Sequence, residues 1–168
     1  YETEHLTIPN QRKVNPLPVD YGRIGAERRE MDGVFRSFTA RSLPERWQSP
    51  LSGRYSSSFG KRRVLNGKPG SPHSGLDIAA PVGTPVESIA AGRVAAVGDY
   101  FFNGQTVMVD HGQGLISMYC HLSEIDVVLG EEVTPDSVVG KVGKTGRVTG
   151  AHLHLSVSLN NARVDPCL

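Results

Sequence analysis

The amino-acid sequence predicts a mainly β protein, an antiparallel β-sheet or sandwich that follows an N-terminal extension containing one amphipathic helix. Of the 19 glycines, 16 lie after residue 50, and short segments with alternating apolar residues run between them. Short strands at regular spacing, separated by turn residues, are typical of antiparallel sheets. Residues 1–50 instead hold five of the 11 prolines and eight of the 18 basic residues. We therefore expect an extension over residues 1–49 and a β domain over residues 50–168.

Composition excludes several classes of protein. No apolar run approaches the roughly 18–20 residues that a membrane-spanning helix needs. The formal net charge of +1 argues against a dedicated nucleic-acid binder. Two cysteines, Cys120 and Cys167, are too few for a disulfide scaffold, and whether they pair stays open. The chain opens at Tyr1 without an apolar signal core, so we expect any targeting segment or anchor to lie outside it.

A helix is predicted over about residues 20–38. Apolar side chains recur there at helical spacing between charged residues; they are Ile24, Met31, Val34, Phe35 and Phe38. Asp20 is the expected N-cap. The apolar face packs most simply on the β domain, with a partner-binding helix as the alternative.

Five later segments read as strands because apolar residues dominate them and glycine-rich turns separate them. These are residues 93–97, 106–109, 116–120, 138–142 and 153–157.

Histidine is the residue type that points to chemistry. In Ala151-His-Leu-His-Leu155, strand alternation places His152 and His154 on one face and two leucines on the other. Neutral imidazoles are good zinc ligands, and two of them side by side on a cleft face suit a metal ion. A pair of solvated surface histidines is the alternative.

A second candidate ligand pair is His73 and Asp77. Pro72, Gly75 and Pro81 disfavour a helix here, so a bend at Ser74-Gly75 must bring the two side chains together. With a strand histidine they would make three protein ligands and leave a fourth position for water, as in catalytic zinc sites. A loop with a local hydrogen bond is the alternative.

A further histidine, His121, ends a predicted strand in Ser117-Met-Tyr-Cys-His-Leu-Ser123. Alternation turns its neighbour Cys120 towards the core, which makes the thiol a poor candidate for a zinc ligand. Taken alone, a histidine at a strand end is as readily structural as catalytic. His111 is expected at a turn, bonded to Asp110.

Taken together, these motifs resemble the LytM/lysostaphin-type zinc metallopeptidases, metallopeptidase family 23. A His-X3-Asp pair, a Tyr-X-His-Leu-Ser segment and a His-X-His strand occur in the order of that family, over about residues 50–168. The resemblance implies that His73, Asp77 and His154 bind one Zn2+. It also implies that His121 and His152 are catalytic acid/base residues, with their individual roles unassigned.

By the same resemblance, residues 50–168 would form a zinc endopeptidase that hydrolyses peptide cross-links of bacterial peptidoglycan. The expected bond is D-Ala to meso-diaminopimelate, the expected partners are the stem peptides, and the expected location is the bacterial periplasm or cell envelope. A secreted glycyl-glycine endopeptidase and a non-catalytic LytM-type amidase activator are the alternatives. A wall-binding module with a closed, four-ligand structural zinc is a third.

Three further residues are expected to contact substrate, namely Arg62, Asn66 and Tyr119. The chain also departs from the family pattern in two respects. Many members carry a glycine in a turn where this chain has Asp136-Ser137. Many members follow the His-X-His strand with Phe-Glu, whereas this chain has Leu155-Ser156.

Overall fold

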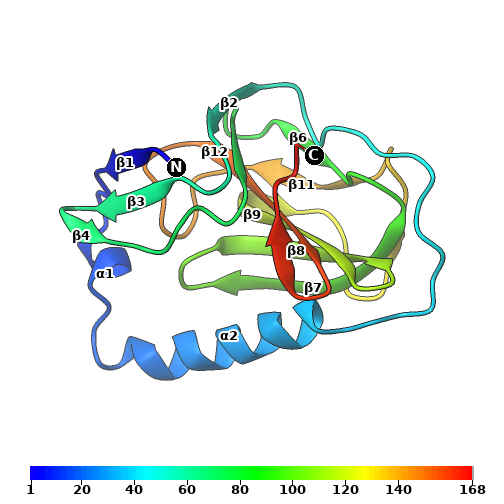
Figure 1. The fold of residues 1–168 in the computed structure, drawn as a ribbon, viewed down its shortest axis with the longest axis horizontal. Coiled ribbons are helices and arrows are strands. Elements are labelled where there is room, and N and C mark those ends of the chain that lie inside the picture. Colours follow the sequence, from blue (N-terminus) through cyan, green and yellow to red (C-terminus); the bar gives the residue numbers. More distant parts are fainter. Residues whose placement is uncertain (168) are drawn as a thin grey trace.

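The structure is a computed structural model that describes residues 1–167, so residue 168, the last of the expected β domain, lies outside it. It confirms a mainly antiparallel β fold with helices near the N-terminus (Figure 1). In chain order the elements are β1 (Thr3–Leu6), α1 (Gln11–Val14), α2 (Asp20–Phe35), β2 (Arg54–Ser57), β3 (Arg62–Leu65), β4 (Lys68–Pro69), β5 (Leu76–Ala79), β6 (Pro85–Glu87), β7 (Gly92–Tyr100), β8 (Gly104–Gly112), β9 (Leu115–Ile125), β10 (Glu132–Val133), β11 (Val138–Val142), β12 (His152–Leu159) and β13 (Ala162–Val164).

One large, ten-stranded sheet contains most of the strands. Its order is β10-β7-β8-β9-β12-β5-β2, while β11 pairs with β6 and β9, and β13 pairs with β12. All of these pairs are antiparallel. The five predicted strands correspond to β7, β8, β9, β11 and β12, each confirmed and most of them longer than predicted. The strands that sequence patterning missed span only two to four residues, too few to display an alternation.

Alternation along the long strands gives the sheet two buried faces. On β8, Val107 and Val109 face the larger apolar core, while Met108 between them faces a smaller core on the opposite side. On β12, Leu153 and Leu155 point into the larger core, which therefore leaves His152 and His154 on the opposite face. The apolar half of the pattern thus determines where the polar half projects.

Helix α2 covers part of the second face. Figure 1 shows it running along the edge of the sheet beneath β7, and Phe35 at its C-terminal end packs with Met108 and Cys120 in the smaller core. The helix ends at Phe35 rather than Phe38, because Ser37 turns back to bond the Val34 carbonyl through both its amide and its hydroxyl. Phe38 is therefore exposed. The prediction of a helix that packs on the β domain is confirmed. The predicted end of the helix was three residues too late.

Asp20 does not cap the helix as expected. It is the first helical residue, and its carboxylate accepts hydrogen bonds from Arg12 and from the Leu17 amide instead. The Arg12 guanidinium lowers the pKa of Asp20, mainly through this hydrogen bond. Asp20 thus ties the start of α2 to α1.

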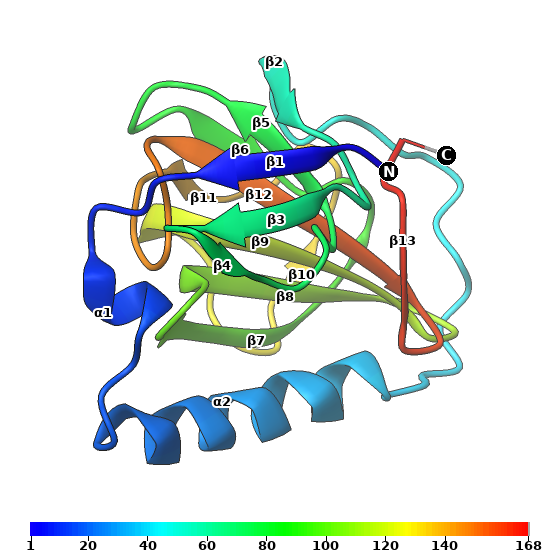
Figure 2. The ribbon, with the colours of Figure 1, turned by 60° about the vertical axis from the view of Figure 1, so that its left-hand side comes forward.

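A second, three-stranded sheet stands beside the large one (Figure 2). Its order is β1-β3-β4, and β1 runs parallel to β3 with Thr3 opposite Arg62. Asn66, in the left-handed region at φ 49°, accepts a hydrogen bond from the Ile8 amide and donates one to the Ile8 carbonyl. The first residues of the chain are thus fastened to the turn between β3 and β4.

Within residues 1–167, no helix is both long enough and apolar enough to cross a membrane. Cys120 is buried and Cys167 is exposed, and both are free thiols. Burial raises the pKa of Cys120 to about 12, which keeps this thiol protonated. The two cysteines therefore do not form a disulfide with each other.

We predict that Phe35→Ala lowers the free energy of unfolding by about 3–5 kcal/mol, since it empties a buried aromatic position in the smaller core. Phe35 is only 2% exposed, and the Arg163 guanidinium carbon lies 3.3 Å from the centroid of its ring. Urea unfolding measures the change. Phe38→Ala is the matched control, because Phe38 is 67% exposed; equal effects of the two substitutions would contradict the packing of α2 on the sheet.

Candidate metal centre

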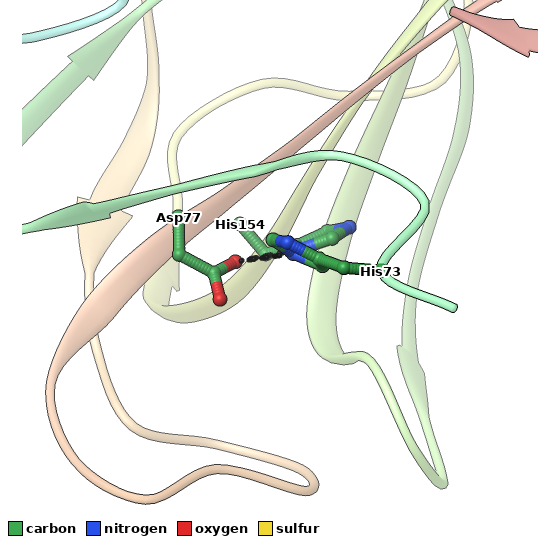
Figure 3. Close-up of side chains that lie close together, drawn as sticks. All are labelled: His73, Asp77 and His154. Carbon is green, nitrogen blue, oxygen red and sulfur yellow. Dashed lines mark hydrogen bonds and ion pairs between the residues drawn. The ribbon is translucent and has the colours of Figure 1, made fainter. Parts of the chain in front are cut away.

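His73, Asp77 and His154 meet at one point on the second face of the large sheet (Figure 3). Asp77 lies on β5 directly opposite His154 on β12, and His73 precedes β5 in a loop. One carboxylate oxygen of Asp77, Oδ1, lies 3.0 Å from His73 Nε2 and 2.8 Å from His154 Nδ1, while the two nitrogens are 3.1 Å apart. All three side chains are buried. The expected bend between His73 and Asp77 is confirmed, and it falls at Gly75.

Each ligand imidazole is held through its other nitrogen. His73 Nδ1 lies 2.8 Å from the Ser58 carbonyl oxygen, to which it can only donate, and this leaves Nε2 with a free lone pair. His154 Nε2 lies 2.8 Å from Ser156 Oγ, whose hydroxyl donates in turn to the Ser74 carbonyl. Ser156 Oγ therefore accepts a hydrogen bond from His154 Nε2–H, which leaves the lone pair of Nδ1 free. Such partners fix the tautomer and the ring orientation of metal ligands.

Arg63 holds the other oxygen of Asp77. Its Nη2 donates to Oδ2 at 2.5 Å, so the carboxylate presents Oδ1 to the two imidazoles. Burial opposes ionisation of Asp77, but the hydrogen bonds to His154 and His73 outweigh it and place the pKa of Asp77 below its ordinary range. Burial lowers the pKa of His154 despite the opposing effect of Asp77. An ionised carboxylate beside neutral imidazole is the protonation state that metal coordination requires.

These three residues suit zinc. Two imidazole nitrogens and one carboxylate oxygen belong to the usual donor set of Zn2+, and tetrahedral coordination at about 2.1 Å separates ligand atoms by about 3.4 Å. The observed separations of 2.8–3.1 Å require only a slight opening. In the described part of the chain, no cysteine and no second carboxylate belongs to this group. The ligand count therefore fits an open site better than the closed four-ligand site of a structural zinc.

Gly75 is needed at the bend for space. A Cβ on Gly75 would lie 2.2 Å from the Leu155 carbonyl oxygen and 2.9 Å from His154 Nε2. Any other residue would push the loop away from β12 and displace a ligand.

His121 and His152 lie beside the metal centre as a second pair. Their ring centroids are 5.0 Å apart, and the His121 ring is 6.1 Å from that of His154. His121 Nδ1 donates to the Thr145 carbonyl at 2.8 Å, and His152 Nδ1 lies 2.9 Å from the Gly150 carbonyl oxygen. His152 Nε2 is 3.8 Å from Asp77 Oδ1. Neither ring belongs to the group of metal ligands, and in each ring Nε2 is free to interact with a substrate.

His121 reaches this position through an irregularity in β9. Its φ is 63°, in the left-handed region that non-glycine residues adopt rarely. Its amide donates to the Asn103 carbonyl, at the point where the pairing of β9 passes from β12 to β11. Burial, with smaller contributions from His152 and His154, lowers the pKa of His121 well below its ordinary value.

A cavity of about 310 Å³ opens over these five residues. Three sides of it come from distant parts of the chain: β1 and its continuation, the loop before β5, and the loops that follow β7 and β11. The lining outside the five residues includes Glu4, Leu6, Ile8, Arg63, Phe102, Asn103 and Arg147. The N-terminal extension is therefore part of the cavity wall.

The three residues expected to contact substrate lie outside this cavity in the structure. Tyr119 is fully buried in the larger core, where its hydroxyl accepts hydrogen bonds from the Ile89 amide and Ser117 Oγ. Asn66 fastens Ile8 as described above, and Arg62 is exposed. The expectation is thus wrong for Tyr119, and the neighbouring Arg63 is the basic residue that lines the cavity.

Sequence reasoning missed three supporting residues: Glu4, Arg63 and Ser156. Ser156 follows His154 by two residues on the same strand, so alternation alone could have placed it on the metal face. Arg62-Arg63 offers no signal for which arginine faces inward. Glu4 accepts a hydrogen bond from Ser57 Oγ at 2.8 Å and lies 3.5 Å from Arg63 Nε, a link that only the pairing of β1 with β3 creates.

Comparison with known proteins adds to this geometry. The profile of Peptidase family M23 matches residues 71–166, a span that contains all five histidine and aspartate residues of the site. The chain belongs to this family. His73, Asp77 and His154 form the metal site typical of M23 zinc peptidases, and the predicted resemblance is confirmed.

Individual M23 relatives agree with this assignment. The chain is 35% identical over 135 residues to the peptidoglycan DD-endopeptidase ShyA of Vibrio cholerae, an alignment that covers 80% of this chain and 30% of ShyA. A crystal structure of a putative M23 peptidase from Pseudomonas aeruginosa superposes with a TM-score of 0.80 at 53% identity, covering 90% of this chain and 62% of that one. The crystal structure of a zinc-containing peptidase from Vibrio cholerae superposes with a TM-score of 0.67 at 30% sequence identity. The match covers 73% of this chain and 39% of that one.

We predict that Ser156→Ala weakens zinc affinity about 10–100-fold, because His154 Nε2 loses the partner that fixes its tautomer. Competition with a chromophoric chelator measures the affinity. Ser158→Ala is the matched control, since Ser158 is a buried serine on the same strand and the same face, bonded to Arg163 rather than to a ligand. An affinity for zinc that is unchanged in Ser156→Ala, or equally weakened in both variants, would contradict this role.

Proposed function

We propose that this chain is a zinc-dependent endopeptidase that hydrolyses peptide cross-links of bacterial peptidoglycan, at the bond between D-Ala and meso-diaminopimelate. The observation that carries the proposal is the combination of three buried ligands with two further histidines on the wall of one cavity. The similarity to ShyA, a peptidoglycan DD-endopeptidase, supports the substrate class. The chain spans about 30% of the length of ShyA. The periplasm or cell envelope, where that substrate lies, is the proposed location.

The ligands and the two other histidines divide the work. His73, Asp77 and His154 would hold the ion, and zinc, when bound, supplies a Lewis acid that lowers the pKa of water towards about 7 and polarises a carbonyl. His121 and His152 each keep Nδ1 on a backbone carbonyl, which aims Nε2 into the cavity. One Nε2 accepts the proton of the attacking water, and that ring becomes an imidazolium. The other ring donates a hydrogen bond to the developing oxyanion, or a proton to the leaving amine, in its imidazolium form, because its Nδ1–H is already engaged with a carbonyl.

The wall of the cavity suits a peptide substrate. Small side chains of the loop before β5 line the cavity together with residues 147–151. A peptide built of small and D-configured residues needs a channel with few side-chain pockets, and the cavity of about 310 Å³ over the ligands is where it would bind. The full set of ligands and both additional histidines support a hydrolase over an amidase activator, a class that lacks zinc residues.

We predict that purified peptidoglycan digested with the zinc-loaded protein yields peptides cut at the cross-link with intact glycan strands, as read by mass spectrometry of the products. Chelation should abolish the cut and zinc should restore it. Cleavage of glycyl-glycine bridges alone would favour the alternative of a secreted glycyl-glycine endopeptidase. No cleavage, together with stimulation of an added amidase, would favour the activator and overturn the proposal.

Substitution of the histidines should separate two classes of defect. We predict that His73→Ala and His154→Ala abolish retention of zinc, whereas His121→Ala and His152→Ala keep zinc and lose about 10²–10⁴-fold in turnover. Metal analysis and initial rates on one preparation of each variant measure both quantities. His5→Ala is the control, because His5 lies on β1 but is exposed and outside the cavity. Undiminished cleavage by His152→Ala would contradict its acid/base role.

A further inference from the structure

The cavity contains two arginines whose electrostatic surroundings differ. Arg63 is compensated, because it donates to Asp77 and lies 3.5 Å from Glu4. Arg147 has no such compensation. Among residues 1–167, its guanidinium makes no hydrogen bond and no ion pair, although its backbone amide donates to the Phe102 carbonyl at 2.8 Å. The cavity therefore carries one positive charge without an anionic partner.

Arg147 is held in place by packing. The carbon at the centre of its guanidinium lies 4.6 Å from the centroid of the Phe102 ring, within the range of a cation–π interaction. Its side chain is half-buried, and this burial, followed by the charge of Arg63, lowers its pKa. The direction of the shift means that the protein makes the charged form less favourable. A ligand that brings a negative charge would relieve this cost.

The position of Arg147 links it to the catalytic end of the cavity. It belongs to the loop in which the Thr145 carbonyl holds His121 and the Gly150 carbonyl holds His152. Phe102 precedes Asn103, whose carbonyl accepts the His121 amide. The loop that presents the guanidinium is thus the one that orients both histidines, and all of these residues except Thr145 line the same cavity.

We propose that Arg147 forms a carboxylate subsite that selects peptide substrates with a free carboxylate beside the scissile bond. With one face of the guanidinium against Phe102, its N–H groups remain free at the edge, in the planar fork that matches a carboxylate. This inference rests on the proposed function and sharpens it. In the bond between D-Ala and meso-diaminopimelate, the carbon that bears the amide nitrogen also bears a carboxylate. A glycyl-glycine bond inside a bridge has no charge at that place.

The test uses two synthetic cross-linked stem peptides that differ only at this carboxylate, which is free in one and a carboxamide in the other. For the zinc-loaded wild type, we expect kcat/KM to favour the carboxylate about 10–100-fold, the effect of a hydrogen bond to a charged group. Arg147→Gln should remove that preference by lowering kcat/KM on the carboxylate peptide alone. Arg147→Lys, which keeps the charge but loses the planar fork, should restore part of it.

Controls separate recognition from structure. Zinc content and the thermal midpoint should be unchanged in Arg147→Gln. Arg28→Gln, which removes an exposed arginine of α2 outside the cavity, should keep the preference of the wild type. An equal loss on both peptides in Arg147→Gln, or an undiminished preference for the carboxylate, would overturn the proposal.

Calorimetric titration of the same two peptides makes the test independent of turnover. If the wild type cuts neither peptide, the proposed function fails. An affinity ratio in favour of the carboxylate that disappears in Arg147→Gln would then still support the subsite. Equal affinities for the two peptides, or no binding of either, would overturn it.

Discussion

The pairing of β5 with β12 places Asp77 opposite His154, and the whole site is built around this register. One oxygen of Asp77 faces two imidazoles and the other faces Arg63, so a single carboxylate orders residues from three segments of the chain. A slip of one residue would bring Leu153 or Leu155 to this place and turn both histidines into the larger core. The apolar side chains that fix the register therefore maintain the metal centre as well.

Period-two alternation was sufficient to predict the long strands and the face shared by His152 and His154. The pairing of His73 with Asp77 could also be predicted, because prolines and Gly75 exclude a helix between them. Alternation failed wherever the backbone departs from a regular strand. His121 lies in the left-handed region, and its neighbours Cys120 and Leu122 therefore enter different cores instead of sharing one.

Other residues could not be placed from local sequence at all. Arg62 and Arg63 are chemically identical neighbours, and only the pairing of β3 with β1 decides which of them reaches the cavity. His111 is fully buried rather than at a surface turn, with Nδ1 on the Ala91 carbonyl and Nε2 on Ser117 Oγ. Burial lowers its pKa. Long-range contacts of this kind leave no periodic signal in the chain.

The division of the chain between residues 49 and 50 stays a prediction. It rests on composition, and residues on both sides of this boundary line the cavity.

The distances along the chain between paired elements also bear on how the protein is made. Ile8 and Asn66 are 58 residues apart, and His73 and His154 are 81 residues apart. During synthesis β1 emerges before β3 and has no partner until β3 follows, and the metal centre has no second imidazole until β12 is in place. Closing such long loops is also the slow part of folding. A nascent chain therefore lacks the complete set of ligands, and the metal centre forms only after the sheet around it is in place.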